Sequence, residues 1–138
     1  SFVKRVDKFQ VDSPKSYRHI LDVMIELSEQ GTNYFEEGAT QSFLDVVQAF
    51  MTQECLLGQQ SGAPIISPVH KQLADLVQQT GGVYKPSGAG GGDIGVALCS
   101  SENTRRPIIE QIDSSDFEII NLSPQLEGVK CTHTYEID

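Results

Sequence analysis

The stretch that decides the fold is KPSGAGGGDIG, residues 85–95, in which four of the five positions from Gly88 to Gly92 are glycine. Glycine costs backbone entropy wherever it is placed, so a cluster of glycines indicates positive φ angles or a ligand that approaches the main chain closely. Successive backbone N–H groups in such a turn form a concave site for an anion. Lys85 before the glycines and Asp93 after them indicate that charge is handled at this loop.

Short apolar segments on both sides of the loop predict a β-loop-β unit. Residues 83–85 are short and strand-like, and residues 94–99 form a continuous apolar run that is typical of a buried strand. Residues 117–122 alternate between apolar and polar side chains, which predicts a further strand. The tail, residues 123–138, is compatible with another strand over residues 129–137 or with an end peculiar to this chain.

Helical spacing of apolar residues accounts for most of the rest of the chain. The segments expected to be helical are residues 2–9, 14–30, 40–57, 68–80 and 102–112. Gly31, Gly58 and Gly81 are expected to end the second, third and fourth helices, and Pro107 to start or kink the fifth. This order predicts a single α+β domain with a small, ferredoxin-like antiparallel sheet packed with helices.

The bulk properties exclude several classes of function. The 138 residues carry 19 Asp and Glu against 10 Lys and Arg, and this acidic balance argues against nucleic-acid and anionic-membrane partners but not against a small anionic ligand. Three cysteines far apart in the chain predict neither a disulfide framework nor a metal site, and favour a reducing, cytoplasmic location. With no apolar run of 18 residues and no signal peptide, we expect neither a membrane span nor export.

The glycine loop fits no common nucleotide motif defined by spacing alone. Nothing in it matches the GxxxxGK[ST] pattern. Gly90, Gly92 and Gly95 satisfy GxGxxG, but a dinucleotide-binding fold needs the third glycine inside a helix, whereas Gly95 lies within a strand-like run. A plain surface hairpin usually needs only one or two glycines. A phosphate-binding loop is therefore the favoured interpretation.

At these residues the sequence resembles the third conserved motif of the GHMP kinases. The resemblance is specific over residues 85–95, and the element order from Pro14 to Leu122 agrees with the C-terminal domain of that superfamily. Asp93 is most similar to the phosphomevalonate kinase version of the motif, since mevalonate kinases tend to continue with glycine. Ile94 departs from the cysteine that many phosphomevalonate kinases have at this position.

The resemblance implies that residues 1–138 are the C-terminal part of a longer, two-domain kinase, which also fits a chain that begins at Ser1. ATP and the phosphorylated substrate would bind between this domain and an N-terminal domain that the chain lacks. The implied reaction uses Mg²⁺ and converts ATP and 5-phosphomevalonate to ADP and 5-diphosphomevalonate. The main catalytic residues would lie in the absent domain, so the fragment alone is expected to be inactive. The alternatives are another GHMP kinase, such as mevalonate kinase, and a non-catalytic ligand-binding module that regulates a partner domain.

The residues expected to bind substrate or phosphate all belong to the loop. They are Lys85, Ser87, Gly88, Ala89, Gly90, Gly91, Gly92 and Asp93. Backbone N–H groups of residues 88–91 can point at anionic oxygens, Ser87 offers a hydroxyl, and Lys85 either reaches an anion or is solvated. Asp93 is expected to accept main-chain N–H groups that shape the turn, in preference to the alternative of binding a metal or a substrate hydroxyl. His19 and His70 have no Cys or carboxylate at ligand spacing and are expected to have no site role.

Overall fold

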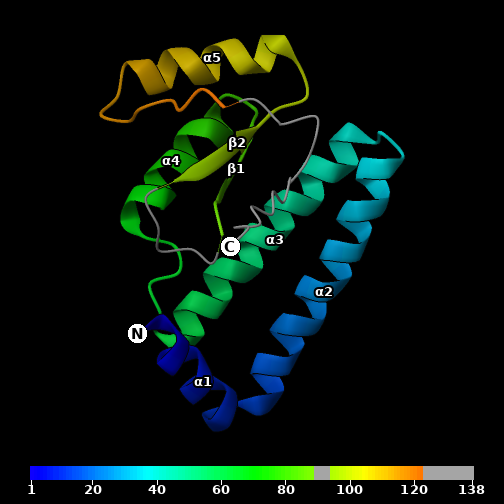
Figure 1. Cartoon of the computed structure of the whole chain (residues 1–138), viewed down its shortest axis with the longest axis vertical. Helices are drawn as coiled ribbons and strands as arrows, with labels where there is room; N and C mark the ends of the chain where they lie inside the picture. The colour runs from blue at the N-terminus through cyan, green and yellow to red at the C-terminus, as the bar shows by residue number, and fades with distance from the viewer. Residues whose placement is uncertain (89–93, 123–138) are drawn as a thin grey trace, which may run out of the picture.

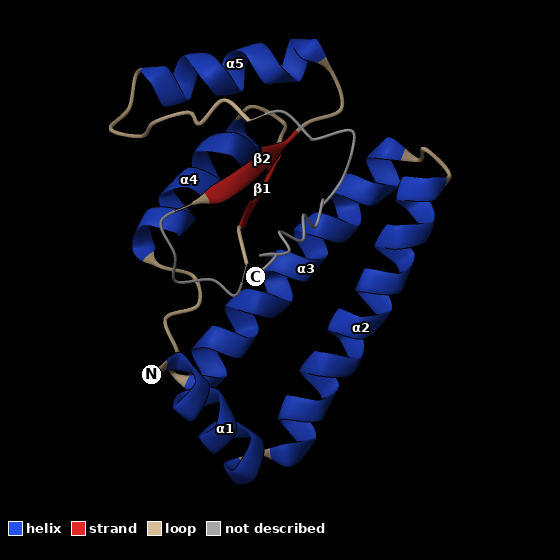
Figure 2. Cartoon of the chain, viewed as in Figure 1, coloured by secondary structure: helices blue, strands red, loops and turns tan. Residues whose placement is uncertain are grey.

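Long helices come first along the chain and a small sheet follows them (Figure 1). The computed structural model describes residues 1–88 and 94–122. Its elements are α1 (Phe2–Asp12), α2 (Pro14–Glu36), α3 (Thr40–Ser61), α4 (Pro68–Gln79), β1 (Val83–Pro86), β2 (Gly95–Leu98) and α5 (Glu102–Asp113). The expected α+β class, with a small antiparallel sheet packed with helices, is confirmed (Figure 2).

Helices α2 and α3 lie side by side and extend beyond the glycines that were expected to end them (Figure 1). Gly31 is buried inside α2, where a Cβ would lie 3.4 Å from Val46 Cγ1 of α3. Gly58 is buried inside α3, where a Cβ would lie 3.0 Å from the Ala63 carbonyl oxygen. Both predicted helix ends are therefore wrong, because these glycines permit close packing and do not reverse the chain.

The turns after these helices use other glycines. Gly38, at a φ of 69°, lies between α2 and α3, and Gly62, at a φ of 66°, directly follows α3. Positive φ angles of this kind are tolerated best by glycine. Although α2 and α3 have 23 and 22 residues, no helix among the described residues is apolar enough along its length to cross a bilayer.

Helices α4 and α5 begin where the sequence predicts, because each has a serine at the capping position. Ser67 Oγ accepts a hydrogen bond of 3.2 Å from the His70 backbone N–H, and Ser101 Oγ accepts one of 3.3 Å from Thr104. These bonds satisfy N–H groups that a helix leaves unpaired in its first turn. Pro107 lies inside α5 and does not start it.

The sheet consists of β1 and β2, paired antiparallel with Tyr84 opposite Ala97 and Pro86 opposite Gly95. Residues 117–122 form no strand, so that prediction is wrong. Their alternation reflects the packing of Phe117 and Ile119 against the core, while Leu122 is exposed. The possible strand over residues 129–137 lies outside the described residues.

The core lies where β1 meets α3, α4 and α5. Its buried members are Met51, Val77, Tyr84, Ile108 and Ile112. The Tyr84 hydroxyl lies 2.6 Å from His70 Nδ1, and burial raises the pKa of this hydroxyl above its ordinary value. The Tyr84 ring also covers Gly95, its diagonal neighbour on β2, so that a Cβ built on Gly95 would overlap the ring.

We expect Gly95→Ala to destabilise the protein by about 1–3 kcal/mol, because the added methyl group displaces a buried ring in a well-packed core. Urea unfolding monitored by circular dichroism measures the change. Val96→Ala, at a neighbouring exposed position of β2, is the control and should change the unfolding free energy by less than about 1 kcal/mol. Equal stability of the wild-type protein and Gly95→Ala would contradict the packing role given to this glycine.

Candidate functional site

The base of the glycine loop is closed by a main-chain hydrogen bond and open to solvent on one side. The Ser87 N–H donates to the Ile94 carbonyl oxygen at 3.0 Å, directly beyond the last paired residues of the sheet. Gly88 is exposed at a φ of 68°, and among the described residues no atom beyond its chain neighbours lies within 4 Å of the position that its Cβ would occupy. The main chain at the start of the loop is therefore accessible to a ligand. Residues 89–93 lie outside the described residues, so the roles expected of Ala89, Gly90, Gly91, Gly92 and Asp93 stay predictions.

Lys85 is held against α3. Its Nζ atom lies 3.4 Å from Glu54 Oε1, donates a hydrogen bond of 3.0 Å to the Pro86 carbonyl oxygen, and lies 5.5 Å from the centroid of the Phe50 ring. The side chain is 27% exposed. Lys85 therefore does not extend freely into solvent, and its charge is balanced by a carboxylate that the sequence analysis did not identify.

Glu54 is the main feature that the sequence analysis missed. Its side chain is only 8% exposed, and its Oε2 atom is buried without a hydrogen-bond partner among the described residues. Burial raises the pKa of the Glu54 carboxyl above its ordinary value of 4.5, and the nearby Lys85 ammonium offsets this only in part. A signal was present in the sequence, since Glu54 follows Phe50 and Met51 at helical spacing on the apolar face of α3. A carboxylate on such a face needs a cation from elsewhere in the chain.

His70 packs against the core. Its ring is 2% exposed and lies against Tyr84, with the two ring centroids 5.9 Å apart. The contact joins the first turn of α4 to β1. Among the described residues, no three His, Cys, Asp or Glu side chains lie close enough together to hold a metal ion.

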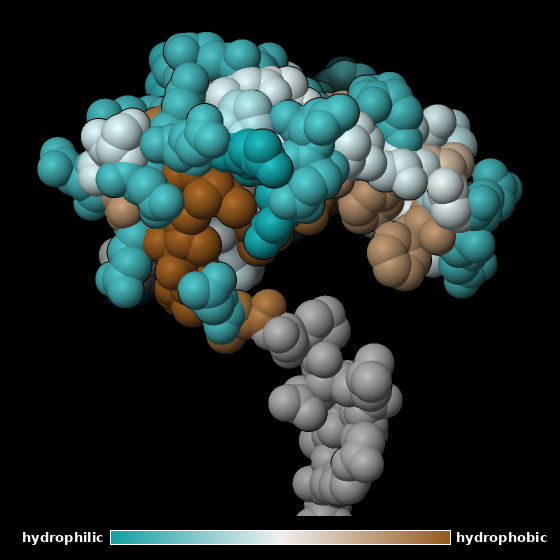
Figure 3. All heavy atoms as spheres, turned by 90° about the horizontal axis from the view of Figure 1, so that it is seen from above, coloured by the Kyte–Doolittle hydropathy of each residue, from teal (hydrophilic) through white to brown (hydrophobic). Residues whose placement is uncertain are grey.

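A groove of about 450 Å³ runs between α2 and α3 and reaches Lys85. Its lining is Leu27, Ser28, Gly31, Thr32, Phe35, Phe43, Val46, Val47, Phe50 and Lys85. Apolar side chains also reach the surface elsewhere, and a view from above shows them gathered in patches bordered by hydrophilic residues (Figure 3). Lys85 thus lines the apolar groove and also stands at the start of the glycine loop.

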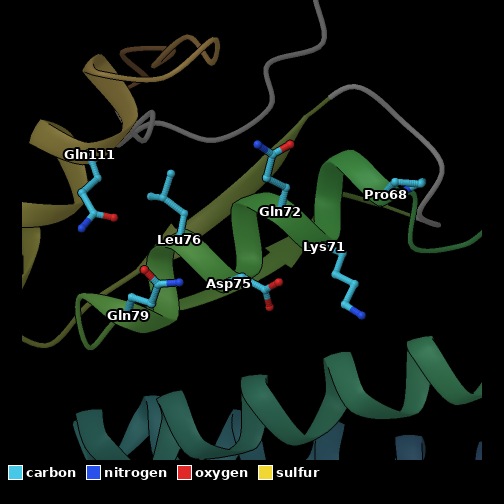
Figure 4. A pocket seen from close by; sticks show the side chains of 7 residues that line it. All are labelled: Pro68, Lys71, Gln72, Asp75, Leu76, Gln79 and Gln111. Atoms are coloured by element: carbon cyan, nitrogen blue, oxygen red, sulfur yellow. The ribbon is translucent and has the colours of Figure 1, made fainter.

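A second hollow of about 450 Å³ lies between α4 and α5 (Figure 4). It is lined by Pro68, Lys71, Gln72, Asp75, Leu76, Gln79 and Gln111. Gln79 and Gln111 lie at one end of it and Lys71 points away at the other, so the polar ends do not converge on one point (Figure 4). This arrangement offers no cluster of groups for catalysis.

Comparisons with known proteins agree with the resemblance seen in the loop. The family model described as "GHMP kinases C terminal" matches residues 35–119. A "Phosphomevalonate kinase" of Streptomyces sp. (strain CL190) is 28% identical over 116 residues, which cover 83% of this chain and 31% of the relative. The crystal structure of a Lin0012 protein from Listeria innocua superposes with a TM-score of 0.76 at 25% identity, covering 82% of this chain and 32% of that one. The chain thus spans about a third of the length of each of these two relatives.

We expect Lys85→Met to destabilise the protein by about 3 kcal/mol at pH 7, because it leaves the buried Glu54 carboxylate without its cation. The loss should shrink as the pH is lowered toward 5. A carboxyl whose pKa is raised in the folded state binds a proton there before it does so in the unfolded chain, so protonation favours the folded state.

Urea unfolding at the two pH values measures this effect. Lys71→Met, at an exposed position of α4, is the control and should have little effect at either pH. A loss for Lys85→Met that is small at pH 7, or that does not depend on pH, would contradict the buried pair.

Proposed function

Because the chain belongs to the GHMP kinase family, as a C-terminal domain, we propose that the protein that carries it is a phosphomevalonate kinase. The reaction is phosphoryl transfer from ATP to 5-phosphomevalonate, which gives ADP and 5-diphosphomevalonate. The finer assignment is supported by the name of the Streptomyces relative and by the loop of residues 85–95. The single structural observation that supports a phosphate-binding role for this loop is the open main chain at Gly88, beside the hydrogen bond that closes the base of the loop.

The residues present fit a phosphate group. Gly88 has a positive φ, and no described residue beyond its chain neighbours lies within 4 Å of its Cβ position, so an anion can approach the backbone there. We propose that backbone N–H groups of residues 88–91 hold an anionic group of the substrate, with the Ser87 hydroxyl beside them. Hydrogen bonds from such donors to a charged group contribute about 1.5–3 kcal/mol each. Asp93 is proposed to shape the turn.

Transfer between two polyanions depends on holding them in line and on balancing their charge. ATP bound with Mg²⁺ supplies the phosphoryl group and a countercharge. The loop of this chain would bind and orient the acceptor, whereas the main catalytic residues would come from an N-terminal domain. This division agrees with a chain that spans about a third of its relatives, and we expect the fragment alone to bind substrate without turnover.

A direct assay of the whole natural protein tests the assignment. Incubated with ATP, Mg²⁺ and 5-phosphomevalonate, it should form 5-diphosphomevalonate, identified by mass spectrometry of the product. Faster transfer to mevalonate or another small alcohol would change the acceptor and keep the family. A folded protein that neither binds ATP nor phosphorylates any acceptor would overturn the proposal and favour a regulatory module.

We expect Gly88→Ala to reduce kcat/KM for the phosphorylated acceptor at least about tenfold, because it alters the backbone at which the acceptor binds. Gly38→Ala is a matched control, since Gly38 has a φ of 69° and, like Gly88, no atom within 4 Å of its Cβ position. Both variants carry the same backbone strain of about 1–2 kcal/mol, but only Gly88→Ala should lose activity. Equal activity of the two variants would contradict a ligand at the loop.

Gly90→Val and Gly91→Val, which are outside the described residues, should abolish turnover.

A further inference from the structure

A buried carboxylate on a helix needs an explanation. Taking a charged pair out of water costs free energy that its mutual attraction repays only with good geometry, and apolar residues of similar size often stabilise a protein equally well. Glu54 is 6% exposed overall and retains one buried oxygen without a partner among the described residues. Stability alone does not account for a carboxylate at this position of α3.

The partner of Glu54 lies at the entrance to the glycine loop. Lys85 is opposite Val96 in the sheet, and the next pair, Pro86 with Gly95, is the last before the chain enters the loop. A fixed Lys85 side chain therefore fixes the end of β1.

Helix α3 contacts the Lys85 ammonium through two side chains. Phe50 and Glu54 are four residues apart on α3 and so lie on the same face of the helix. Glu54 Oε1 lies 3.4 Å from the Lys85 ammonium, and the Phe50 ring centroid lies 5.5 Å from it. A ring face and a carboxylate together define both the position and the direction of a lysine side chain. The end of β1 is thereby tied to a helix of 22 residues.

We propose that Glu54 is a positioning residue for the kinase reaction: by holding Lys85, it sets the point at which the glycine loop leaves the sheet. The inference rests on the proposed function, and Glu54 itself is assigned no contact with substrate. A strand end that is fixed before the ligand arrives reduces the ordering cost of binding. Loss of Glu54 should therefore weaken binding of the acceptor and leave the chemical step nearly unchanged.

Hydrogen exchange tests the positioning without any substrate. In the whole natural protein, Glu54→Gln should speed exchange of the Ser87 amide about tenfold or more, because this amide closes the base of the loop, while the Val77 amide in the core stays protected. Asp45→Asn is the matched control, since Asp45 is an exposed carboxylate on the same helix whose partner is Gln41. It should leave both amides unchanged. Unchanged Ser87 exchange in Glu54→Gln, or an equal increase at Ser87 and Val77, would overturn the proposal.

Steady-state kinetics gives the second readout. Glu54→Gln should raise the KM of the phosphorylated acceptor about tenfold and change kcat less than about twofold. Adding Lys85→Met to Glu54→Gln should raise the KM no further, because the two residues act as a unit. Additive effects, or an unchanged KM, would overturn the proposal. If the wild-type protein has no kinase activity, the proposed function fails while the exchange experiment still decides whether Glu54 fixes the loop.

A second pair of substitutions separates positioning from stability. Glu54→Met with Lys85→Met replaces the ion pair by apolar side chains of similar length and should keep the unfolding free energy within about 1 kcal/mol of the wild type. Because a contact between two methionines has no defined direction, Ser87 exchange should still be fast and the KM still raised. Wild-type exchange and KM in this stable variant would show that packing alone suffices, and would overturn the role given to Glu54.

Discussion

The domain depends on the packing of two neighbouring side chains of β1 against different surroundings. The Tyr84 ring enters the core, where it contacts His70 and covers Gly95, while the Lys85 ammonium lies against Glu54 and Phe50 of α3. A strand of only four residues thereby holds α3, α4 and β2 together. A two-stranded sheet is marginal by itself, so it is these side-chain contacts that make it a stable support for the loop.

Local chemistry predicted where helices begin better than where they end. Ser67 and Ser101 cap α4 and α5 by bonds within a few residues, so the sequence contains all that is needed. A glycine, in contrast, permits either a reversal of the chain or the close approach of another segment. Only the residue that packs against the glycine shows which of the two applies. Gly31 lies next to Val46 of another helix, which no local pattern reveals. The alternation at residues 117–122 led to a wrong strand prediction for a related reason. Side chains that pack against a core without strand pairing can also alternate along the chain, as Phe117 and Ile119 do.

The glycine loop could be identified from the sequence because its glycine content exceeds what a hairpin needs and because its residues resemble the motif of a known family. The contacts of Lys85 could not be predicted, because Glu54 lies far from it in sequence and the two residues meet only after β1 packs on α3. A charged residue on the apolar face of a helix indicates that a partner exists, but not which of several cations it is. Sequence reasoning thus identified the segment that we propose binds the ligand, and missed the contact between Glu54 and Lys85 at its base.

The glycines of the loop region also affect how a genetic selection for activity would be interpreted. Gly88 and Gly95 flank the same segment, yet one leaves its backbone open while the other makes room for an aromatic ring. Variants at both positions would reduce growth in a selection that scores activity alone, and would be grouped as one functional motif. Protein abundance measured in the same cells would separate them, because larger side chains clash with the Tyr84 ring at position 95, whereas at position 88 their size meets no neighbouring residue that the structure describes. The glycine motif therefore combines two constraints: one imposed by folding at Gly95, and one at Gly88 that the proposed ligand would impose.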